Sequence, residues 1–297
     1  MDIDRISEGL EHIIDKHPPL DRIAYGLMFG EGPVWNHRKK QLYWVDIIGN
    51  TIWKWKPGIG QEVVLRPSGH ADGMTLDPQG RLVVAGWCSR TVWRMEKDGS
   101  IVTLASHYGD KKLNTPNDIV VRSDASIYWT DMTGGLIIPG MVAEDVQQYL
   151  EVEGVFRLSP DGKQVTLVIG NCAAPNGLAF SPDESELFLN DSRLGTIRVF
   201  PVNADGSVGP GRLFHQLTGA EEGVADGMKI DTAGNVYCTG PGGIHVINPE
   251  GKLLGRLKMP GHCTNIAWGD DDWRSLYVTT CDSVYRTRVK IPGVATW

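Results

Sequence analysis

The sequence predicts an all-β fold, a six-bladed β-propeller with four-stranded antiparallel blades. Three observations lead to this prediction. A short motif recurs six times, a regular pattern of strands and turns follows each copy, and an unused strand precedes the first copy. Glycine is abundant, with 36 residues, and 17 prolines accompany it, which favours many short strands over long helices.

The repeated motif begins with a polar residue at the start of a strand, and a turn and a second strand follow. Its copies begin at Glu31, Asp72, Asn117, Asn176, Asp226 and Thr264. These starts are 41, 45, 59, 50 and 38 residues apart. That spacing is close to the ~40–50 residues of a propeller blade.

Each copy continues into a third strand of alternating β-branched and aromatic residues, such as TIWKWKP and TIRVFPVNADG. The last copy lacks a fourth strand, and we expect the segment Asp21–Met28 to supply it and to close the ring. The prediction is therefore a single domain over residues 1–297, with residues 1–20 as an N-terminal helical extension. A second short helix is considered at Glu144–Glu151.

Charge and cysteine content narrow the class of protein. The net charge of −7 disfavours a nucleic-acid or anionic-membrane partner, and no run of ~20 apolar residues predicts a membrane span. The N-terminal segment is charged and lacks the apolar core of a signal peptide. Five scattered cysteines without CxxC spacing argue against a disulfide scaffold or a thiolate zinc site. We therefore expect a cytoplasmic protein.

The residues that open the six copies should form a ring at one end of the central channel, because the first strand of a blade is innermost. All six carry side-chain oxygen and three are carboxylates. Asn and Asp also start strands simply as turn formers, and for a single copy that interpretation suffices. Several carboxylates on one axis need a counter-ion, however, and oxygen donors suit calcium, magnesium or manganese. The second strands end at the same mouth, and three of them end in an acid: Asp46, Asp131 and Asp191. These acids either support the metal ligands or contact the substrate, or they serve only as the acids of hairpin turns.

Four motifs occur in order along the chain: EGPVW at Glu31, PND at Pro116, PNGLAFSPD at Pro175 and DGMKID at Asp226. Together they resemble the SMP-30/gluconolactonase/luciferin-regenerating-enzyme family, in its bacterial sugar-lactonase type. The resemblance implies a divalent metal held by Glu31, Asn176 and Asp226, with Asn117 on the metal or the substrate. It implies hydrolysis of a sugar lactone to the aldonic acid. Calcium is the first expectation for the metal, and zinc, manganese, magnesium or iron(II) are alternatives.

The chain departs from that family pattern around the expected substrate. Thr115 stands where animal members carry an arginine, and Thr133-Gly134-Gly135 stands where they carry an acidic pair. Asp72 replaces an asparagine that is frequent in bacterial members. Asn117, Asp72, His70 and Thr115 are therefore the predicted substrate-binding residues, and D-glucono-1,5-lactone is a test substrate.

For the chemistry, Asp226 is the predicted general base, and Asp72 is the alternative.

The long insertion at residues 132–153 is either a lid over the mouth or a passive surface loop. Hydrolysis by a nucleophilic serine or cysteine is disfavoured, because the sequence has no GxSxG or HExxH motif and no cysteine–histidine pairing that spacing would single out. Two alternatives stay open: another metal-dependent hydrolase, acting on an aromatic lactone or a phosphotriester, and a non-catalytic binding propeller. The expected partner is a small lactone, and the oligomeric state is not predicted.

Overall fold

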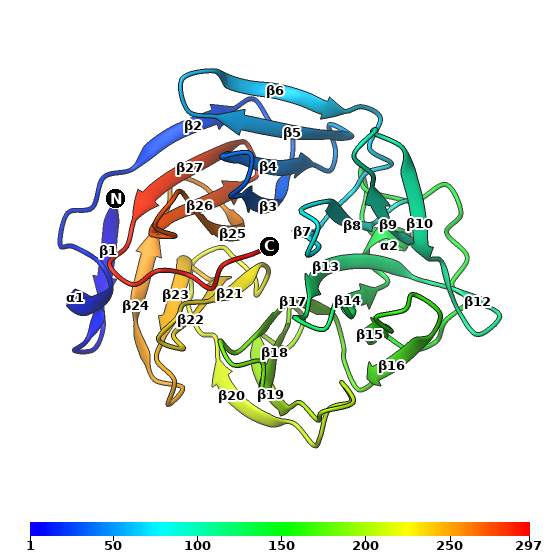
Figure 1. The fold of residues 1–297 in the computed structure, drawn as a ribbon. Coiled ribbons are helices and arrows are strands. Elements are labelled where there is room, and N and C mark those ends of the chain that lie inside the picture. The colour runs from blue at the N-terminus through cyan, green and yellow to red at the C-terminus, as the bar shows by residue number, and fades with distance from the viewer.

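The protein is a ring of six antiparallel sheets around a central axis (Figure 1). The computed structural model describes residues 1–297. Four consecutive strands of each sheet run outward from the axis, with the exception of the sixth sheet, which takes its outer strand from the beginning of the chain. The predicted six-bladed β-propeller is confirmed.

The strands occupy equivalent places in the six blades. The innermost strands are β3 (Gly30–Asn36), β7 (Met74–Leu76), β13 (Thr115–Val121), β17 (Pro175–Phe180), β21 (Met228–Ile230) and β25 (Cys263–Gly269). The second strands are β4 (Gln41–Asp46), β8 (Leu82–Gly86), β14 (Ile127–Met132), β18 (Glu186–Asp191), β22 (Val236–Gly240) and β26 (Ser275–Thr280). The third strands are β5 (Thr51–Lys56), β9 (Thr91–Met95), β15 (Gly154–Leu158), β19 (Thr196–Pro201), β23 (Gly243–Ile247) and β27 (Ser283–Arg288). The outer strands are β6 (Gly60–Leu65), β10 (Ile101–Ala105), β16 (Val165–Ile169), β20 (Arg212–Gln216), β24 (Leu253–Lys258) and β2 (Asp21–Tyr25).

Strand β2 closes the ring as the sequence predicts. It pairs antiparallel with β27, with Asp21 opposite Arg286 and Tyr25 opposite Ser283. Blade six thus combines the two ends of the chain, in the order β2-β27-β26-β25. The two ends of the chain are therefore joined by main-chain hydrogen bonds inside one blade, and the amide of Gly30 in blade one donates to the carbonyl of Cys281 beside blade six at 3.1 Å.

The first 20 residues contain a strand as well as a helix. Strand β1 (Asp2–Arg5) pairs with β24 as a fifth strand of blade five, and the short helix α1 (Leu10–Ile13) follows. Leu10 is buried in the core cluster that blades five and six share. Two short strands, β11 (His107–Tyr108) and β12 (Lys111–Lys112), form a separate ribbon.

The helix considered at 144–151 does not form. The short helix α2 (Gly134–Ile137) lies earlier in the same insertion, and the segment 144–151 has no regular structure. Leu150 is buried in the core of blades two and three, and the carbonyls of Asp145 and Gln147 accept hydrogen bonds from the guanidinium of Arg90. Tertiary contacts therefore override the helical propensity of this segment.

Adjacent blades approach closely at the axis, which explains the glycine after most of the opening residues. A Cβ on Gly32, whose φ is +51°, would lie 2.3 Å from the carbonyl oxygen of Asp72. The amide of Gly73 donates to the carbonyl of Asn117 at 2.7 Å, and that of Gly227 donates to Thr264 at 2.8 Å. Neighbouring motifs are thus joined through their main chains.

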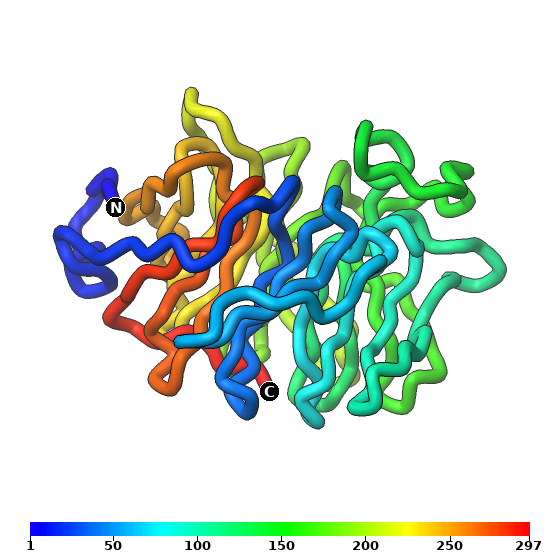
Figure 2. Tube along the Cα trace, turned by 90° about the horizontal axis from the view of Figure 1, so that it is seen from above, coloured from blue at the N-terminus to red at the C-terminus, as the bar shows by residue number.

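The channel has a front mouth, which is the end where the six innermost strands begin, and a rear mouth, which is the end where they finish. Viewed from the side, the insertion at 132–153 projects at the front mouth, whereas the last residues of the chain lie at the rear mouth (Figure 2). The same last residues lie over the centre of the ring in Figure 1.

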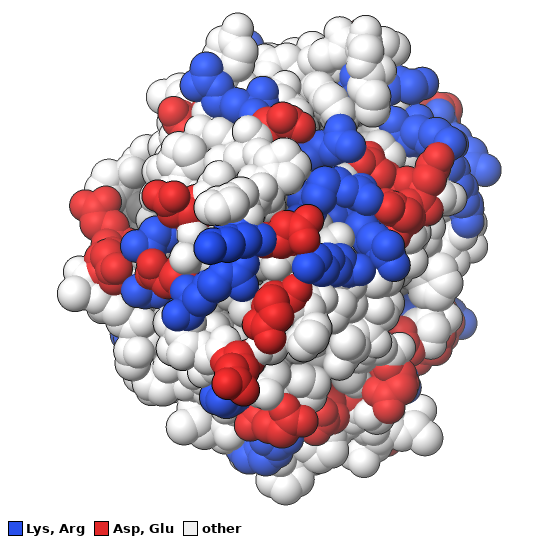
Figure 3. Space-filling model, turned by 90° about the vertical axis from the view of Figure 1, so that its left-hand side faces the viewer, with Lys and Arg blue, Asp and Glu red and all other residues white.

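The outer surface carries mixed charge. On the side that includes β1, β24 and β27, basic and acidic side chains alternate without a large patch of one sign (Figure 3). Arg256 and Lys258 pair with Asp4 there, at 2.9 and 3.1 Å. No helix in the structure is long and apolar enough to cross a membrane.

Candidate active site

The carboxylates that open the inner strands are buried together at the front mouth. The exposed fraction is 3% for Glu31, 3% for Asp72 and 8% for Asp226. Amide side chains separate them: Asn117 Nδ2 donates to Asp72 Oδ2 at 2.7 Å, and Asn265 Nδ2 donates to Glu31 Oε2 at 2.8 Å. The opening residues therefore form a ring of acids and amides on the axis.

Two members of the ring differ from the simple pattern of the repeat. The Thr264 hydroxyl donates to the carbonyl of Gly30 and also hydrogen-bonds the Thr279 hydroxyl, so both of its contacts are within the protein and it does not join the ring. Asn265, the next residue, reaches Glu31 instead. Blade six reads TN and blade three reads ND, whereas the other blades have glycine at this second position. A polar residue in place of that glycine is the signal that could have identified Asn265 and Asp118.

Asp118 and Lys229 form an ion pair inside the channel that sequence reasoning missed. Lys229 Nζ lies 3.3 Å from Asp118 Oδ2 and also donates to the carbonyl of Met228 at 3.1 Å. The side chain of Asp118 is 3% exposed and that of Lys229 is 23% exposed. The motif DGMKID contains this lysine, but no spacing indicates that it meets an acid 111 residues away.

Burial and mutual repulsion raise the pKa values of the ring carboxyls. Burial raises the pKa of Glu31 to about 7, against a lowering by hydrogen bonds from Gly32 and Asn265. Burial first, and the nearby charge of Glu31 second, hold the pKa of Asp72 and of Asp226 well above the usual range. The positive charge of Lys229 lowers the pKa values of Glu31 and Asp226 in part. These acids lack sufficient positive charge from the protein itself.

The donor set at the front mouth fits a hard divalent cation. Glu31 Oε2 accepts from the amide of Gly32 at 2.6 Å, but Glu31 Oε1 is buried and has no hydrogen-bond partner. An unpaired, buried carboxylate oxygen is costly unless a cation binds it. No cluster of three or more His, Cys, Asp or Glu side chains surrounds a common position, so the donors are a mixed set of carboxylates and amides. Oxygen donors of this kind favour calcium, magnesium or manganese over thiolate-binding metals.

His70 lies in the loop between β6 and β7 at the front mouth. Its Nδ1 lies 2.7 Å from the carbonyl oxygen of Ile47 and its main-chain amide donates to Asn50. A carbonyl only accepts hydrogen bonds, so Nδ1 carries the proton and the lone pair of the neutral ring is on Nε2. The ring is therefore held in the tautomer that accepts a proton at Nε2.

Thr115 is fully buried beneath the mouth rather than at its surface. Its hydroxyl donates to the carbonyl of Met132 and accepts from the amide of Gly135 at 3.1 Å. A Cβ on Gly135 would lie 2.6 Å from the indole nitrogen of Trp87. Thr115 therefore supports α2 at the base of the insertion.

The insertion at 132–153 is tied to blade two. The indole of Trp87 donates to the carbonyl of Met141 at 2.8 Å. The buried Arg90 donates to the carbonyls of Asp145 and Gln147 at 2.8 and 2.9 Å, and to those of Leu113 and Asn114. These bonds fix the insertion beside the front mouth as a wall in this structure.

The acids that end the second strands serve the backbone. Asp46 accepts from the amides of Met28, Phe29 and Gly49, and Asp191 accepts from those of Ala173 and Ala174. Asp131 accepts from the amide of Asn114 at 2.8 Å, and burial raises its pKa to about 8. These residues hold the loops that lead into the next blade, which is the hairpin-acid alternative of the sequence analysis.

Comparison with known proteins agrees with this architecture. The family model for the SMP-30/gluconolactonase/LRE-like region matches residues 29–282. The chain is 31% identical to a gluconolactonase from Zymomonas mobilis over 98% of this chain and 87% of that protein. A solved gluconolactonase from Xanthomonas campestris has a TM-score of 0.90 and 28% identity, covering 97% of this chain and 95% of that chain.

A solved regucalcin from Agrobacterium tumefaciens, described as calcium-binding, is 18% identical with a TM-score of 0.75, covering 92% of this chain and 97% of that one. At that identity the likeness supports the fold alone. The family model covers most of the chain and includes every residue of the front-mouth ring. The protein is a member of the SMP-30/gluconolactonase/LRE-like family.

Proposed function

We propose that this protein hydrolyses a sugar lactone to its aldonic acid at the front mouth, with one divalent cation held by Glu31, Asn176 and Asp226. The observation that carries the proposal is the buried ring of carboxylates in which Glu31 Oε1 has no partner. The relatives that are named gluconolactonases support the reaction class, and the protein is a lactone-hydrolysing enzyme of their family.

We propose calcium as the resident ion, with zinc, manganese, magnesium and iron(II) as alternatives. Carboxylate and amide oxygens without sulfur are the preferred ligands of calcium, and the ring has no histidine. Asn117 contacts the cation or the substrate, since its Nδ2 is occupied by Asp72 and its side-chain oxygen is available. When bound, the cation polarises the lactone carbonyl and stabilises the negative charge that develops on its oxygen.

Asp226 is the proposed general base. It takes a proton from the water that attacks the carbonyl carbon, and the bond from that carbon to the ring oxygen then breaks. The ring oxygen leaves as a hydroxyl group after receiving a proton, so the product is a hydroxy acid. The neighbouring side-chain amide of Asn176 acts against the rise in the pKa of Asp226. Asp72 is the alternative base, although one of its oxygens already accepts from Asn117.

His70 and the insertion are proposed to shape the substrate site. Nε2 of His70 is available to accept a hydrogen bond from a sugar hydroxyl, because Nδ1 is bound to Ile47. Thr115 acts through Gly135 and the wall of the insertion rather than by touching the sugar. Thr133-Gly134-Gly135 stands where animal members carry an acidic pair, and the Thr133 hydroxyl donates to the Glu153 carboxylate at 2.8 Å on this side. D-glucono-1,5-lactone is the first substrate to test.

The five cysteines are free in the structure. Free thiols persist in reducing compartments, and we propose a cytoplasmic location on this ground.

The test is pH-stat hydrolysis by chelator-treated protein, with each metal added back separately. The substrate panel contains aldonolactones, an aromatic lactone and a phosphotriester. Restoration by calcium with an aldonolactone preferred supports the proposal. Preference for the phosphotriester or the aromatic lactone would replace the substrate class, and metal binding without turnover of any substrate would indicate a binding propeller.

A further inference from the structure

We propose that the rear half of the axial channel is a second binding site, for a small amphipathic carboxylate that places its charged group on Lys229. This site is separate from the front-mouth ring and independent of the proposed lactonase activity. The proposal depends on a cavity, on the single basic side chain that lines it, and on the engagement of the acids at its rim.

The cavity has a volume of about 430 Å³, which lies within the ~300–1,000 Å³ of small-molecule sites. All six innermost strands contribute to it, through Trp35, Thr75, Val120, Ala179, Lys229 and Ala267. Most of the lining residues are hydrophobic, and none of the front-mouth ring residues is among them. The cavity is therefore a distinct chamber at the other end of the same axis.

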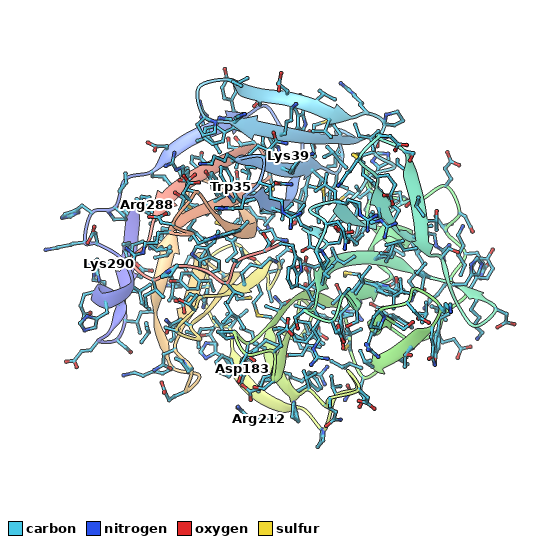
Figure 4. The ribbon with its side chains drawn as sticks, viewed as in Figure 1. Trp35, Lys39, Asp183, Arg212, Arg288 and Lys290 are labelled. Atoms are coloured by element: carbon cyan, nitrogen blue, oxygen red, sulfur yellow. The ribbon has the colours of Figure 1, made fainter.

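The last residues of the chain form one wall of this chamber. Val294, Thr296 and Trp297 line it, and the Thr296 hydroxyl donates to the carbonyl of Trp35 at 3.2 Å. In the axial view, Trp35 and Asp183 lie on opposite sides of the centre (Figure 4). Residues from all six blades and from the end of the chain therefore surround the chamber.

Lys229 is the only basic side chain that lines the cavity. Its ammonium has three N–H donors, of which Asp118 and the carbonyl of Met228 accept two. The side chain is 23% exposed, while Asp118 behind it is 3% exposed. The remaining donor is available to a ligand, and an anionic acceptor makes the stronger hydrogen bond.

The acids at the rim are engaged by their own turns. Asp183 accepts from the hydroxyls of Ser181 and Ser185, and Glu184 accepts from the amide and the hydroxyl of Ser123. Glu184 also lies 3.6 Å from Arg122. Both acids keep their charge, but their oxygens face partners in the protein, and the Lys229 ammonium is the one cationic donor that a carboxylate ligand meets in a mainly hydrophobic lining.

The test uses isothermal titration calorimetry of the full chain without metal, so that a carboxylate cannot bind a cation at the front mouth. The probes are 3-phenylpropionate and its uncharged amide. We expect the acid to bind at one site and the amide to bind at least about tenfold more weakly, because the amide lacks the charge. Equal affinity of acid and amide, or no binding of the acid, overturns the proposal.

Variants locate the site. Lys229→Met should weaken binding of 3-phenylpropionate at least about tenfold, while Lys163→Met, at an exposed lysine, should leave it unchanged. Since Lys229→Met leaves Asp118 without its partner, Ala267→Leu provides a second test by filling the cavity. Binding that persists unchanged in Ala267→Leu places the probe elsewhere and refutes the rear site.

Discussion

At the residue scale, Glu31 has one carboxylate oxygen that is buried without a donor, a feature that it shares with Asp131. Burial is the main cause of its raised pKa, and the charge of Asp118 adds to the effect. Such a group is tolerated when a cation binds it or when it keeps a proton. The burial that makes the ring carboxylates unfavourable in the absence of a cation is therefore the same feature that would favour binding of one.

The first prediction concerns the ring acids. Glu31→Gln and Asp226→Asn should each weaken calcium binding at least about tenfold, or ~1.4 kcal/mol, because each removes a charged donor. Lactone hydrolysis should fall with it. Calorimetric titration of calcium into each variant, with kcat/KM on the preferred lactone, provides the measurement.

Asp46→Asn is the matched control, because Asp46 is buried but bonds only to main-chain amides. It should lower thermal stability and leave calcium affinity unchanged. Wild-type activity in metal-free Asp226→Asn protein would falsify the axial-metal mechanism.

The second prediction concerns Asp131, whose pKa is raised to about 8 by burial. An unfolded aspartate titrates near ~3.9, so between these values the folded protein binds the extra proton. Raising the pH through this window therefore lowers the free energy of unfolding, by up to ~1.4 kcal/mol per pH unit, and the effect ends above about pH 8.

Asp131→Asn removes this titration. Urea unfolding of both proteins should give stability curves that diverge as the pH rises from about 5 to 8, with the wild type losing more. Parallel curves would show that Asp131 is ionised in the folded protein. The front-mouth acids are common to both proteins and cancel in the difference.

The sequence predicts which end of the axis holds the residues that open each repeat, but it does not predict the Asp118–Lys229 ion pair beside them. The repeat assigns Glu31, Asp72 and Asp226 to one end of the axis because they share a position in it. Lys229 and Asp118 do not share that position, and their contact depends on how strands from blades three and five converge inside the channel. Thr115 was expected to bind substrate, whereas its environment depends on the insertion, whose path has no repeat to predict it.

At the scale of elements, Arg90 determines the path of the insertion. Its side chain is fully buried and donates to carbonyls within the segment, at Asp145 and Gln147, and to carbonyls of the loop before β13. The sequence predicts a helix at Glu144–Glu151, and hydrophobic periodicity could not reveal that a buried guanidinium holds this backbone in an irregular path.

The third prediction follows from these bonds. Arg90→Met leaves several carbonyls without donors and should lower the free energy of unfolding by ~3 kcal/mol. Limited proteolysis should then cleave within residues 138–149 first. Arg193→Met, at an exposed arginine, is the control and should change neither result. Resistance equal to the wild type would mean that Trp87 and Thr115 hold the insertion without Arg90.

The fourth prediction concerns the role of the insertion in specificity. Replacing the loop between Gly134 and Glu151 with a short turn should change the relative rates on different lactones by more than it changes calcium affinity, because the loop forms a wall of the mouth and supplies no ring residue. Rates across the substrate panel, normalised to one lactone, provide the measurement. Unchanged ratios would assign the insertion a passive role.

At the scale of the whole molecule, the fold was the most predictable feature. Six copies of one motif constrain the architecture far more than any single strand does, and each third strand lies where its alternating pattern placed it. The addition of β1 to blade five could not be predicted, because a four-residue strand has no pattern to distinguish it.

The fifth prediction tests ring closure with two adjacent residues of β2. Ala24 is 1% exposed and Tyr25 is 65% exposed. Ala24→Glu buries a charge between β2 and blade six and should lower the free energy of unfolding by ~3 kcal/mol or more, whereas Tyr25→Glu should change it by less than ~0.5 kcal/mol. Thermal unfolding of both variants makes the comparison, and similar melting temperatures would contradict a stabilising role for the closure.

The pairing of β2 with β27 also has a consequence for how the molecule comes apart. Linear repeat proteins have two terminal repeats with one neighbour each, and they fray from those ends. Here every repeat has two neighbours, so the array is periodic and has no terminus at which fraying can begin. Loss of any one blade costs two interfaces at once, and the propeller should unfold as a single cooperative unit even though it is built from modules.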